Sequence, residues 1–533
     1  MRREQVFWGW GEPGAGPSLP EHAIPFLRDE LGVDGSVVDR PVGLADVRLR
    51  PSELDPGVRR RLEDVVGAEH VRDDREARVL RCRGKSYLDL LAQRAGDCEA
   101  APDAVVAPAD GAEVRAVLEL CSDAGVAVIP FGGGTSVVGG LEAERGGHAA
   151  AISLDLARMD RVIAVDERSQ TAVLGPGLRL PEANRALGAR GHRLAHTPQS
   201  YEWATVGGCV ATRSAGQSST GHGRIDEQVV ALRCATPRGE LATVAAPASA
   251  TGPSLRELLV GSEGALGVIT EVTVRVRPVP AVRRHEAFFF HTFGEGCDAL
   301  RRLEQAGLAP DIARLSDEAE TRVTLGLAGG GSPLARAVLR ARGYADGCLL
   351  IAGWEGSADG VGRRRGLAAR VLREAGAMAA GRRPGEAWAA ARFAGPHLRD
   401  DLLDRGVMVE TLETATTWSN LERVRDAVQA ALAGAVGGCH ASHLYPTGAS
   451  LYFTVFARRD SNDPVGQWRA LKTAATDAIV ESGGTITHHH AVGRDHAPWL
   501  GAELGTVGVE LLRAVKERCD PAGIMNPGVL LRG

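Results

Sequence analysis

The sequence predicts an α+β protein, and two observations indicate this class. Between Asp103 and Pro280, short apolar runs alternate with glycine turns, as is typical of short strands. From residue 281 to 480, the apolar run Ala287 to Phe290 is followed by long alanine- and arginine-rich stretches with helical spacing. A chain of 533 residues is long enough for two or three domains.

Changes in composition divide the chain into four regions. Residues 1–100 are rich in charge and contain helical fragments such as Pro51 to Val66. Residues 101–280 form the strand-rich region, and 281–480 the helix-rich region. Residues 481–533 return to glycine turns, in ESGGTITHHHAVG and DPAGIMNPGVLL. We expect these boundaries to separate structural units.

One βαβ-like unit opens the second region. Two apolar runs, 104–107 and 126–129, flank a helical stretch in which Asp110 and Glu113 have the spacing of a capping box. Val114, Val117, Leu118 and Cys121 fall on one face of that helix. The region closes with a strand in which apolar and polar residues alternate cleanly from Glu271 onward, and we expect Pro278 to end it.

Composition excludes several classes of function. A net charge of −5, with arginines interspersed among acids, gives no sign of a nucleic-acid partner. The nine cysteines are odd in number, widely spaced and without a CxxC pair, which favours reduced thiols in a cytoplasmic protein. The N-terminus has no apolar signal-peptide core, and no apolar run is long enough to span a bilayer.

The segment PFGGGTSVVGG, Pro130 to Gly140, is typical of a loop that binds a diphosphate. Gly132, Gly133 and Gly134 let the backbone approach a ligand and can take positive φ, while Thr135 and Ser136 add hydroxyl donors. GxGxxG does not fit, because Val137 occupies the last glycine position, and no GK[ST] of a P-loop follows. A plain glycine-rich turn is the alternative for this segment alone. Two further segments, TVGGCVATRSAGQ and LLVGSEGALGVITEV, favour the nucleotide site.

In this order the three segments resemble the FAD-binding domain of the vanillyl-alcohol oxidase family, also called the PCMH type. The resemblance implies a two-subdomain FAD-binding domain, an α+β cap domain with an antiparallel sheet, and a C-terminal segment that returns to the flavin. Because the first loop contains neither histidine nor cysteine, we expect non-covalent FAD. The cofactor-binding positions carried over are Pro130, Gly132, Gly133, Gly134, Thr135, Ser136, Pro198, Ser200, Thr205, Gly207, Gly208, Thr212, Glu263, Gly264, Gly267 and Ile269.

Metal-assisted 2-hydroxy-acid dehydrogenases of this family bind a divalent ion through two histidines and a glutamate. Here His443 matches the first ligand, but Tyr452 stands at the second histidine and His489 at the glutamate. A phenol is a poor ligand for such a site, and the carboxylate is missing. We therefore expect no metal.

From about residue 80 to the end, the chain resembles the alkyldihydroxyacetonephosphate synthase branch of the family. The matching segments are RGKSYLDLLAQRAGD, HTPQS, ARLSDEA, VETLETATTW, GASLYF and HHHAVG. The resemblance implies an FAD-dependent transferase of ether-lipid biosynthesis. The implied enzyme exchanges the acyl group of acyl-dihydroxyacetone phosphate for a fatty alcohol, and its flavin is neither oxidised nor reduced overall.

The same resemblance assigns roles to particular residues. Tyr452 transfers a proton at the substrate carbon, with a positive field from neighbouring histidines or arginine. His488, His489 and His490 supply that field and hydrogen bonds. Arg399 matches an active-site arginine. Arg314 and His196 match substrate-binding residues. Gln199 and Thr197 replace acids of the branch's HEPDS motif, and Ala491 replaces a glycine, so roles attached to those positions do not carry over.

Simpler interpretations remain open for each residue taken alone. Tyr452 fits a core aromatic of a strand, Arg399 a solvated side chain beside two aspartates, and the histidine triplet a metal-binding or surface tract. Three consecutive histidines cannot all face one way on a strand, so we expect only one or two to line the site.

Two other classes of function also remain, a redox flavoenzyme acting on a 2-hydroxy acid or related alcohol and a non-catalytic FAD-binding protein. The resemblance further implies a small-molecule lipid substrate, homodimers and peripheral membrane contact.

Overall fold

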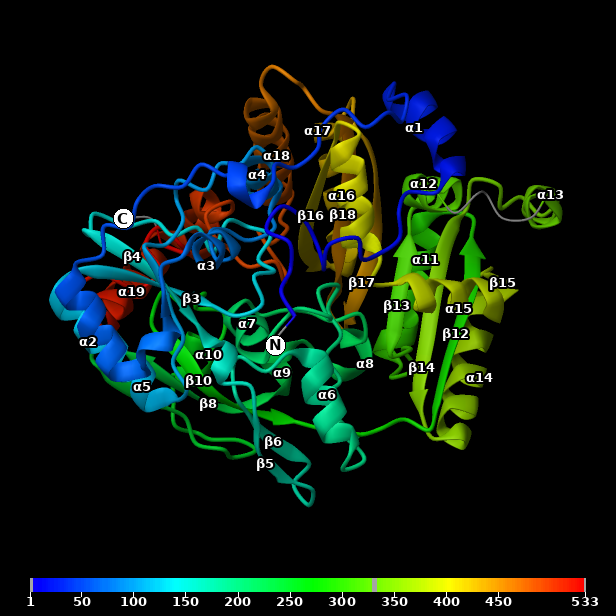
Figure 1. The fold of residues 1–533 in the computed structure, drawn as a ribbon. Coiled ribbons are helices and arrows are strands. Elements are labelled where there is room, and N and C mark those ends of the chain that lie inside the picture. Colours follow the sequence, from blue (N-terminus) through cyan, green and yellow to red (C-terminus); the bar gives the residue numbers. More distant parts are fainter. Residues whose placement is uncertain (1–2, 328–332, 532–533) are drawn as a thin grey trace.

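The computed structural model describes residues 3–327 and 333–531 and has the α+β architecture predicted from the sequence. Figure 1 shows a nucleotide-binding half, drawn in blue to green, beside a tall sheet with helices packed on it. The helices that connect or flank the sheets are α1 Ile24–Leu31, α2 Pro56–Val66, α3 Arg75–Leu80, α4 Tyr87–Arg94, α6 Leu180–Gly188, α7 Val206–Ala211, α8 Ser219–His222, α9 Ile225–Gln228, α10 Leu255–Leu259, α12 Glu318–Leu327, α13 Pro333–Ala341, α15 Arg382–Ala391 and α16 Gly395–Asp404.

The first half is built on two sheets. A four-stranded sheet has the order β1 (Val71–Arg72), β2 (Ala104–Val106), β4 (Ala150–Asp155), β3 (Val126–Phe131), and its last three strands are parallel. The predicted helix is α5 (Gly111–Ala124), and Asp110 caps it by accepting from the N–H groups of Ala112 and Glu113. Its buried face packs with α2 and the sheet in one apolar core.

The second sheet of this half is antiparallel, with the order β5 (Val162–Asp166), β6 (Thr171–Leu174), β10 (Val268–Arg275), β8 (Val229–Thr236), β9 (Gly239–Ala242). In β10 burial alternates from Glu271 onward, as predicted. The predicted end was wrong, because β10 stops at Arg275. Pro278 belongs to a separate short strand, β11 (Arg277–Pro278), which pairs with β7 (His192–Arg193).

The cap contains one seven-stranded antiparallel sheet, with the order β15 (Met378–Gly381), β12 (Val282–Phe290), β14 (Cys348–Gly356), β13 (Ile312–Ser316), β17 (Val436–Tyr445), β18 (Gly448–Arg458), β16 (Val407–Thr417). Alternate residues of its strands pack against α11 (Phe293–Gln305), α14 (Ala358–Glu374), α17 (Leu421–Ala431) and α18 (Pro464–Glu481). One face is therefore an apolar core. The opposite face of β13, β17, β18 and β16 carries polar side chains.

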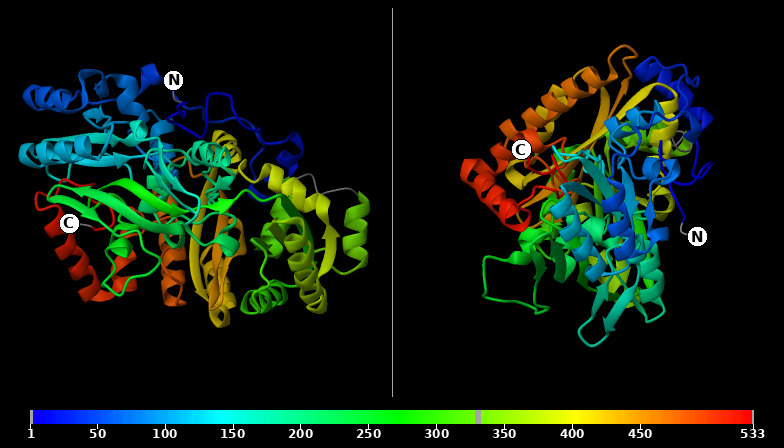
Figure 2. Two further views of the ribbon diagram at one scale, coloured as in Figure 1. Left: turned by 90° about the horizontal axis from the view of Figure 1, so that it is seen from below. Right: turned by 60° about the vertical axis from the view of Figure 1, so that its left-hand side comes forward.

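The two ends of the chain tie the halves together. After α19 (Leu500–Cys519) the chain returns to the first half, where Met525 pairs with Val128 beside β3 and both Ile524 and Met525 are completely buried. Figure 2 shows this red segment against the cyan and green strands. At the other end, Gln5 donates to the carbonyl of Gly133, and the N–H of Leu19 donates to Asp401 on α16.

The thiols and the helix lengths complete the description of the fold. All nine cysteines are free thiols. Across the described ranges 3–327 and 333–531, no helix combines the length and the apolarity that a bilayer crossing requires.

Candidate functional site

The first glycine loop follows β3 and needs glycine for two different reasons. A Cβ atom on Gly132 would lie 2.4 Å from Thr205 Oγ1, and one on Gly133 would lie 2.2 Å from the carbonyl oxygen of Trp203. Of the three glycines, only Gly134 has a positive φ, +69°. The sequence suggested positive φ for all three, but at Gly132 and Gly133 the requirement comes from the close approach of another segment.

The three predicted glycine segments pack on one another. The contacts of Gly132 and Gly133 join the first segment to the second, in which Thr205 caps α7. The third joins them at Gly264, whose φ is +77° and whose Cβ would lie 2.9 Å from Pro130 Cγ. Asn526 of the C-terminal segment donates from Nδ2 to the carbonyls of Glu263, at 2.7 Å, and Gly140, at 3.2 Å.

Several of the remaining predicted cofactor positions serve the scaffold through their side chains. Thr212 donates to the carbonyl of Gly208, and Ser136 accepts from the N–H of Gly140. Ile269 is buried in the core of the antiparallel sheet. Gly207 and Gly267 lie against Pro176 and the carbonyl of Ala235. In its contact with Gly140 the Ser136 hydroxyl accepts, and it can still donate its own hydrogen.

The remaining four positions lie in the same loops. Pro198 and Ser200 offer carbonyls to the turn that precedes the second segment, and Thr135 is half-buried in the first loop. The carboxylate of Glu263 accepts from the N–H groups of Val492 and Gly493, and burial raises its pKa to about 7.

A small cavity adjoins the first glycine loop. Gly132, Gly133 and Gly134 line this cavity together with basic side chains from two other segments, namely Arg81, Arg83, Lys85 and Arg179. The acids Glu4 and Asp155 line the same cavity and pair with Arg81, at 2.9 and 2.7 Å, so the lining carries both signs of charge. Burial lowers the pKa of Lys85 to about 8, and its Nζ donates to the carbonyls of Val6 and Phe7.

The polar face of the cap sheet aligns three side chains on neighbouring strands. Tyr452 of β18 is directly opposite Glu413 of β16 on one side and His440 of β17 on the other. The rings of His440 and Tyr452 stack with their centroids 5.0 Å apart. Because the flanking residues point to the apolar core, the alternation of the strands sets this row. Tyr452 is therefore not a core aromatic.

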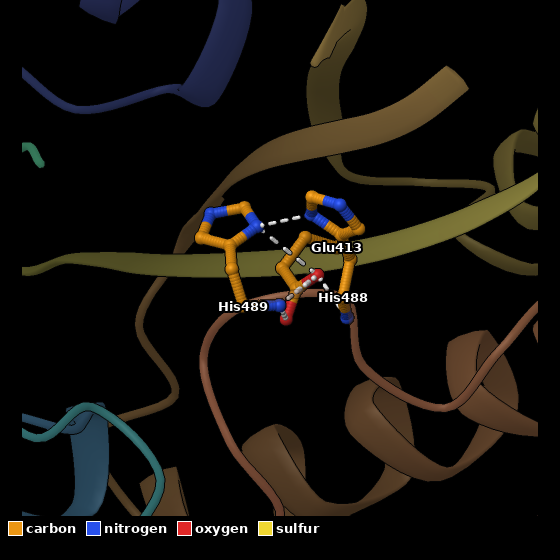
Figure 3. Close-up of side chains that lie close together, drawn as sticks. All are labelled: Glu413, His488 and His489. Carbon is orange, nitrogen blue, oxygen red and sulfur yellow. Dashed lines mark hydrogen bonds and ion pairs between the residues drawn. The ribbon is translucent and has the colours of Figure 1, made fainter. Parts of the chain in front are cut away.

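Glu413 holds the histidine triplet in place. Its carboxylate accepts from the main-chain N–H groups of His488, at 2.5 Å, His489, at 3.2 Å, and His490, at 2.9 Å, and from the hydroxyl of Thr487. Figure 3 shows this carboxylate beneath the rings of His488 and His489. Burial alone would raise the pKa of Glu413. The surrounding histidines and the Thr487 hydroxyl instead hold it well below its usual range.

The triplet lies on a loop of bends and not on a strand. The number of its rings that line the site stays a prediction. The Nδ1 atoms of His488 and His489 are 2.9 Å apart, and the ring of His490 meets Tyr452 edge-on at 5.5 Å. His443, which the dehydrogenase comparison singled out, stacks on His488 at 5.4 Å. It is a bulge residue of β17 with φ +49°, and its buried Nδ1 has no hydrogen-bond partner in the described chain.

Burial keeps the imidazoles of this cluster uncharged near neutral pH. It lowers the pKa of His489 to about 4 and holds those of His488 and His443 well below the ordinary value. It also raises the pKa of Tyr452 to about 12. The imidazoles therefore supply hydrogen bonds rather than the positive field expected from the sequence, and the phenol keeps its proton.

Glu413, His488 and His489 also bring three potential metal-ligand atoms within 4.8 Å of one another. Both carboxylate oxygens of Glu413, however, already accept from the loop's N–H groups. This donor set suits a clamp on the loop better than a metal centre.

The other predicted residues lie at different distances from the cluster. Arg314 of β13 pairs with Glu320 at 3.0 Å, and Glu320 bonds His440 at 2.9 Å, so Arg314 joins the row of Tyr452. His196 is completely buried and bonds Ser214, and burial lowers its pKa to about 3, with the neighbouring His489 contributing.

Arg399 stands apart from these residues. On α16 it donates to the carbonyl of Lys85, at 2.9 Å, and none of its hydrogen bonds or ion pairs in the described chain reaches the triplet or Tyr452. Its contacts therefore place it with the basic residues near the glycine loop.

Sequence reasoning missed three residues of the cluster: Glu413, His440 and Tyr445. Glu413 lies in the quoted motif VETLETATTW, and strand alternation places both it and His440 on the face that carries Tyr452. No local sequence pattern predicts the β-bulge at His443. Tyr445, whose hydroxyl is 2.7 Å from His488 Nε2, is found only through tertiary contact.

Comparison with known proteins agrees with this geometry. Residues 102–245 match the family described as "FAD binding domain", and residues 279–530 match "FAD linked oxidases, C-terminal domain". The fold and the glycine cradle thus define a flavoprotein with FAD as its cofactor. Crystalline p-cresol methylhydroxylase, at 16% identity, shares the fold with a TM-score of 0.66 over 90% of this chain and 98% of its own.

Two closer relatives narrow the class. The alkyldihydroxyacetonephosphate synthase of Dictyostelium discoideum is 32% identical over 95% of this chain and 87% of its own. A crystal structure of an alkyldihydroxyacetonephosphate synthase superposes with a TM-score of 0.84 at 28% identity, covering 98% of both chains. This chain belongs to the alkyldihydroxyacetonephosphate synthase family, which confirms the predicted resemblance, the fold class and FAD.

Proposed function

We propose that this protein is an alkyldihydroxyacetonephosphate synthase. It exchanges the acyl chain of acyl-dihydroxyacetone phosphate for a fatty alcohol and thereby forms an ether-lipid precursor. The observation that carries the proposal is the position of Tyr452, between His440 and the clamped triplet on the polar face of the cap sheet. The nucleotide-binding half contacts the same cluster, because Arg224 donates to the carbonyl of His488 at 2.6 Å.

We assign different residues of the chain to different roles in the reaction. The three glycine segments would hold FAD non-covalently, and the bound flavin supplies an electrophilic ring without net oxidation of the substrate. Tyr452, protonated in its buried position, would hold or move a proton at the substrate carbon. The neutral rings of His488, His489 and His490 each offer one donor and one acceptor nitrogen. Arg314, Arg399 and His196 stay proposed substrate contacts.

The lipid substrate motivates two finer proposals. Helix α13 exposes Leu334, by 75%, and Val338, by 44%, one turn apart beside the exposed Arg340. We propose this helix as a peripheral membrane contact, in a cytoplasmic protein whose thiols are all free. Sedimentation with anionic vesicles tests the contact. We also propose a homodimer, on the ground of the resemblance to the family. Analytical ultracentrifugation tests this oligomeric state.

Replacing Tyr452 with phenylalanine tests the activity itself. Tyr452→Phe is expected to lower the incorporation of labelled fatty alcohol by about 100-fold or more. The substitution keeps the aromatic ring and removes the hydroxyl group that carries the transferred proton. FAD absorbance should be unchanged. Tyr344→Phe is the matched control, because Tyr344 donates to the carbonyl of Gly376 away from the cluster. Wild-type incorporation by Tyr452→Phe would remove the phenol from the mechanism.

The match of residues 279–530 to FAD linked oxidases favours a redox flavoenzyme as the second candidate. The two candidates differ in what a hydroxy acid does to the flavin. Under anaerobic conditions lactate, glycolate and 2-hydroxyglutarate should leave the flavin oxidised if the exchange reaction is correct. Bleaching by any of them, with no labelled ether formed, would establish the redox function instead.

A further inference from the structure

Tyr445, His488 and His489 form a continuous line of hydrogen bonds that the proposed function leaves unused. His489 Nδ1 and His488 Nδ1 are 2.9 Å apart, and His488 Nε2 is 2.7 Å from the hydroxyl of Tyr445. An Nδ1-to-Nδ1 contact requires one ring to donate and the other to accept. The tautomer of one ring therefore fixes the tautomer of the next.

The line runs from the interior to the edge of the cap. At its inner end, the ring of His489 stacks on that of Tyr452 with centroids 5.9 Å apart, and Nε2 is the ring nitrogen that the contact with His488 leaves over. At its outer end, Tyr445 closes β17 and is partly exposed, directly before the exposed turn residues Pro446 and Thr447.

The proposed reaction leaves one proton to be removed. The bond between the substrate carbon and the acyl oxygen breaks, the bond between that carbon and the alcohol oxygen forms, and no electrons are gained or lost overall. The fatty acid leaves as a carboxylate, since such an acid is ionised at neutral pH. The hydroxyl proton of the alcohol must therefore reach water in every turnover.

We propose that His489, His488 and Tyr445 carry this proton from the reaction centre to solvent, a proposal that rests on the proposed function. The proton enters at His489 Nε2, and Nδ1 of the same ring releases its own proton to His488 Nδ1. His488 Nε2 then releases a proton to the Tyr445 hydroxyl, which gives one to water. Afterwards every hydrogen bond of the line is reversed in direction. His489 must return to the Nδ1-protonated tautomer and His488 to the Nε2-protonated tautomer before the line can carry the next proton.

The residues around His488 and His489 favour the neutral form of both imidazoles. Burial holds the pKa values of both imidazoles below the ordinary range, so each ring starts with one proton to give and one nitrogen to fill. Arg224 donates to the carbonyl of His488 and pairs with Asp226 at 2.6 Å, which fixes the loop. Glu413 faces the rings but is engaged by the loop's N–H groups. Its low pKa keeps it from trapping the proton.

Replacing Tyr445 with phenylalanine interrupts the outer end and keeps the ring. In the FAD-loaded enzyme, Tyr445→Phe is expected to lower kcat for labelled alcohol incorporation about tenfold or more, with KM for the alcohol unchanged. The solvent deuterium isotope effect on kcat should rise, and imidazole buffer should restore part of the rate. Tyr344→Phe, which also loses one hydrogen bond, should match the wild type in all three readouts.

The ¹⁵N resonances of the histidines give a readout that needs no turnover. Tyr445→Phe should shift those of His488 and His489 and leave the signal of His291, which stacks on Tyr344, in place. A wild-type kcat for Tyr445→Phe, or a lowered kcat without isotope or buffer effects, would overturn the relay while leaving the exchange activity standing. A wild-type enzyme that makes no ether would overturn the proposed function and the relay together.

Discussion

A single carboxylate, Glu413, organises the most densely hydrogen-bonded loop of the site. It is 1% exposed and opposite Tyr452 in the sheet, so the residue that clamps the histidines is also a neighbour of the proposed proton-transfer group. Its charge is supported by the main-chain N–H groups of three consecutive residues, because a carboxylate that accepts several such bonds is stable even when buried.

Removing that charge is expected to loosen the loop. Glu413→Gln replaces one acceptor oxygen by an NH₂ group, which faces N–H donors, and should lower the free energy of unfolding by about 2–4 kcal/mol. Urea unfolding measures the change. Glu240→Gln is the control, because Glu240 pairs with Arg233 at the surface and should change stability far less. Equal losses in the two variants would contradict the clamp.

Buried histidines make stability depend on pH in a defined direction. The folded pKa of His196 is about 3 against an ordinary 6.5, because burial disfavours the charged ring. Between these values the unfolded chain binds a proton that the folded chain does not, so stability falls as pH falls.

His196→Gln should remove this contribution. The stability of the wild type minus that of the variant is expected to be constant above pH 6.5 and to shrink as pH falls toward 3, by about 1.4 kcal/mol per pH unit. Urea titrations at a series of pH values measure it. A difference that stays flat down to pH 4 would mean that His196 is protonated in the folded protein.

At the scale of the structural elements, the glycine turns were predictable from the sequence, but the contacts that require some of their glycines were not. Three glycine-rich segments predicted a nucleotide cradle, and they do meet. The pattern did not reveal that Gly132 and Gly133 are required by the close approach of Thr205 and Trp203, since that contact joins segments about 70 residues apart in the sequence. Likewise, alternation placed Tyr452 on a strand, but the bulge at His443 arises from pairing between β17 and β18.

Gly133→Ala isolates the effect of close approach. Its φ lies outside the left-handed region, so alanine is allowed by the backbone, and the new Cβ meets only the Trp203 carbonyl and its neighbours. We expect FAD affinity to fall at least tenfold, measured by fluorescence titration. Gly366→Ala within α14 meets no atom within 4 Å and should keep affinity while stabilising the helix by about 0.5–1 kcal/mol. Unchanged affinity in Gly133→Ala would place the diphosphate elsewhere.

At the scale of the whole molecule, composition predicted the order of the four regions along the chain. It did not predict how these regions pack against one another. The resemblance to the family, and not glycine turns or helical spacing, implied the FAD-binding half, the cap and the returning C-terminus. The boundaries at 100, 280 and 480 stay predictions. The bridge between Val128 and Met525 and the bond from Gln5 to Gly133 depend on contacts between the ends of the chain and its middle. Local patterns carry no signal for such contacts.

The returning segment should matter for overall stability. Met525 is completely buried in the core of the parallel sheet, so Met525→Ala is expected to cost about 2–5 kcal/mol through lost burial and a cavity. Thermal and urea unfolding with FAD bound measure the loss. Val507→Ala on the exposed side of α19, where Val507 is 67% exposed, should be nearly neutral. A neutral Met525→Ala would show that the tail is not part of the core.

The contact of Asn526 with Gly140 and Glu263 has a consequence for biogenesis. A ribosome delivers Pro130 and Gly264 long before Asn526, so this contact between the glycine segments can form only after the later segment has been made. Chains that stop short of Asn526 should therefore lack this support of the glycine segments and bind the flavin more weakly.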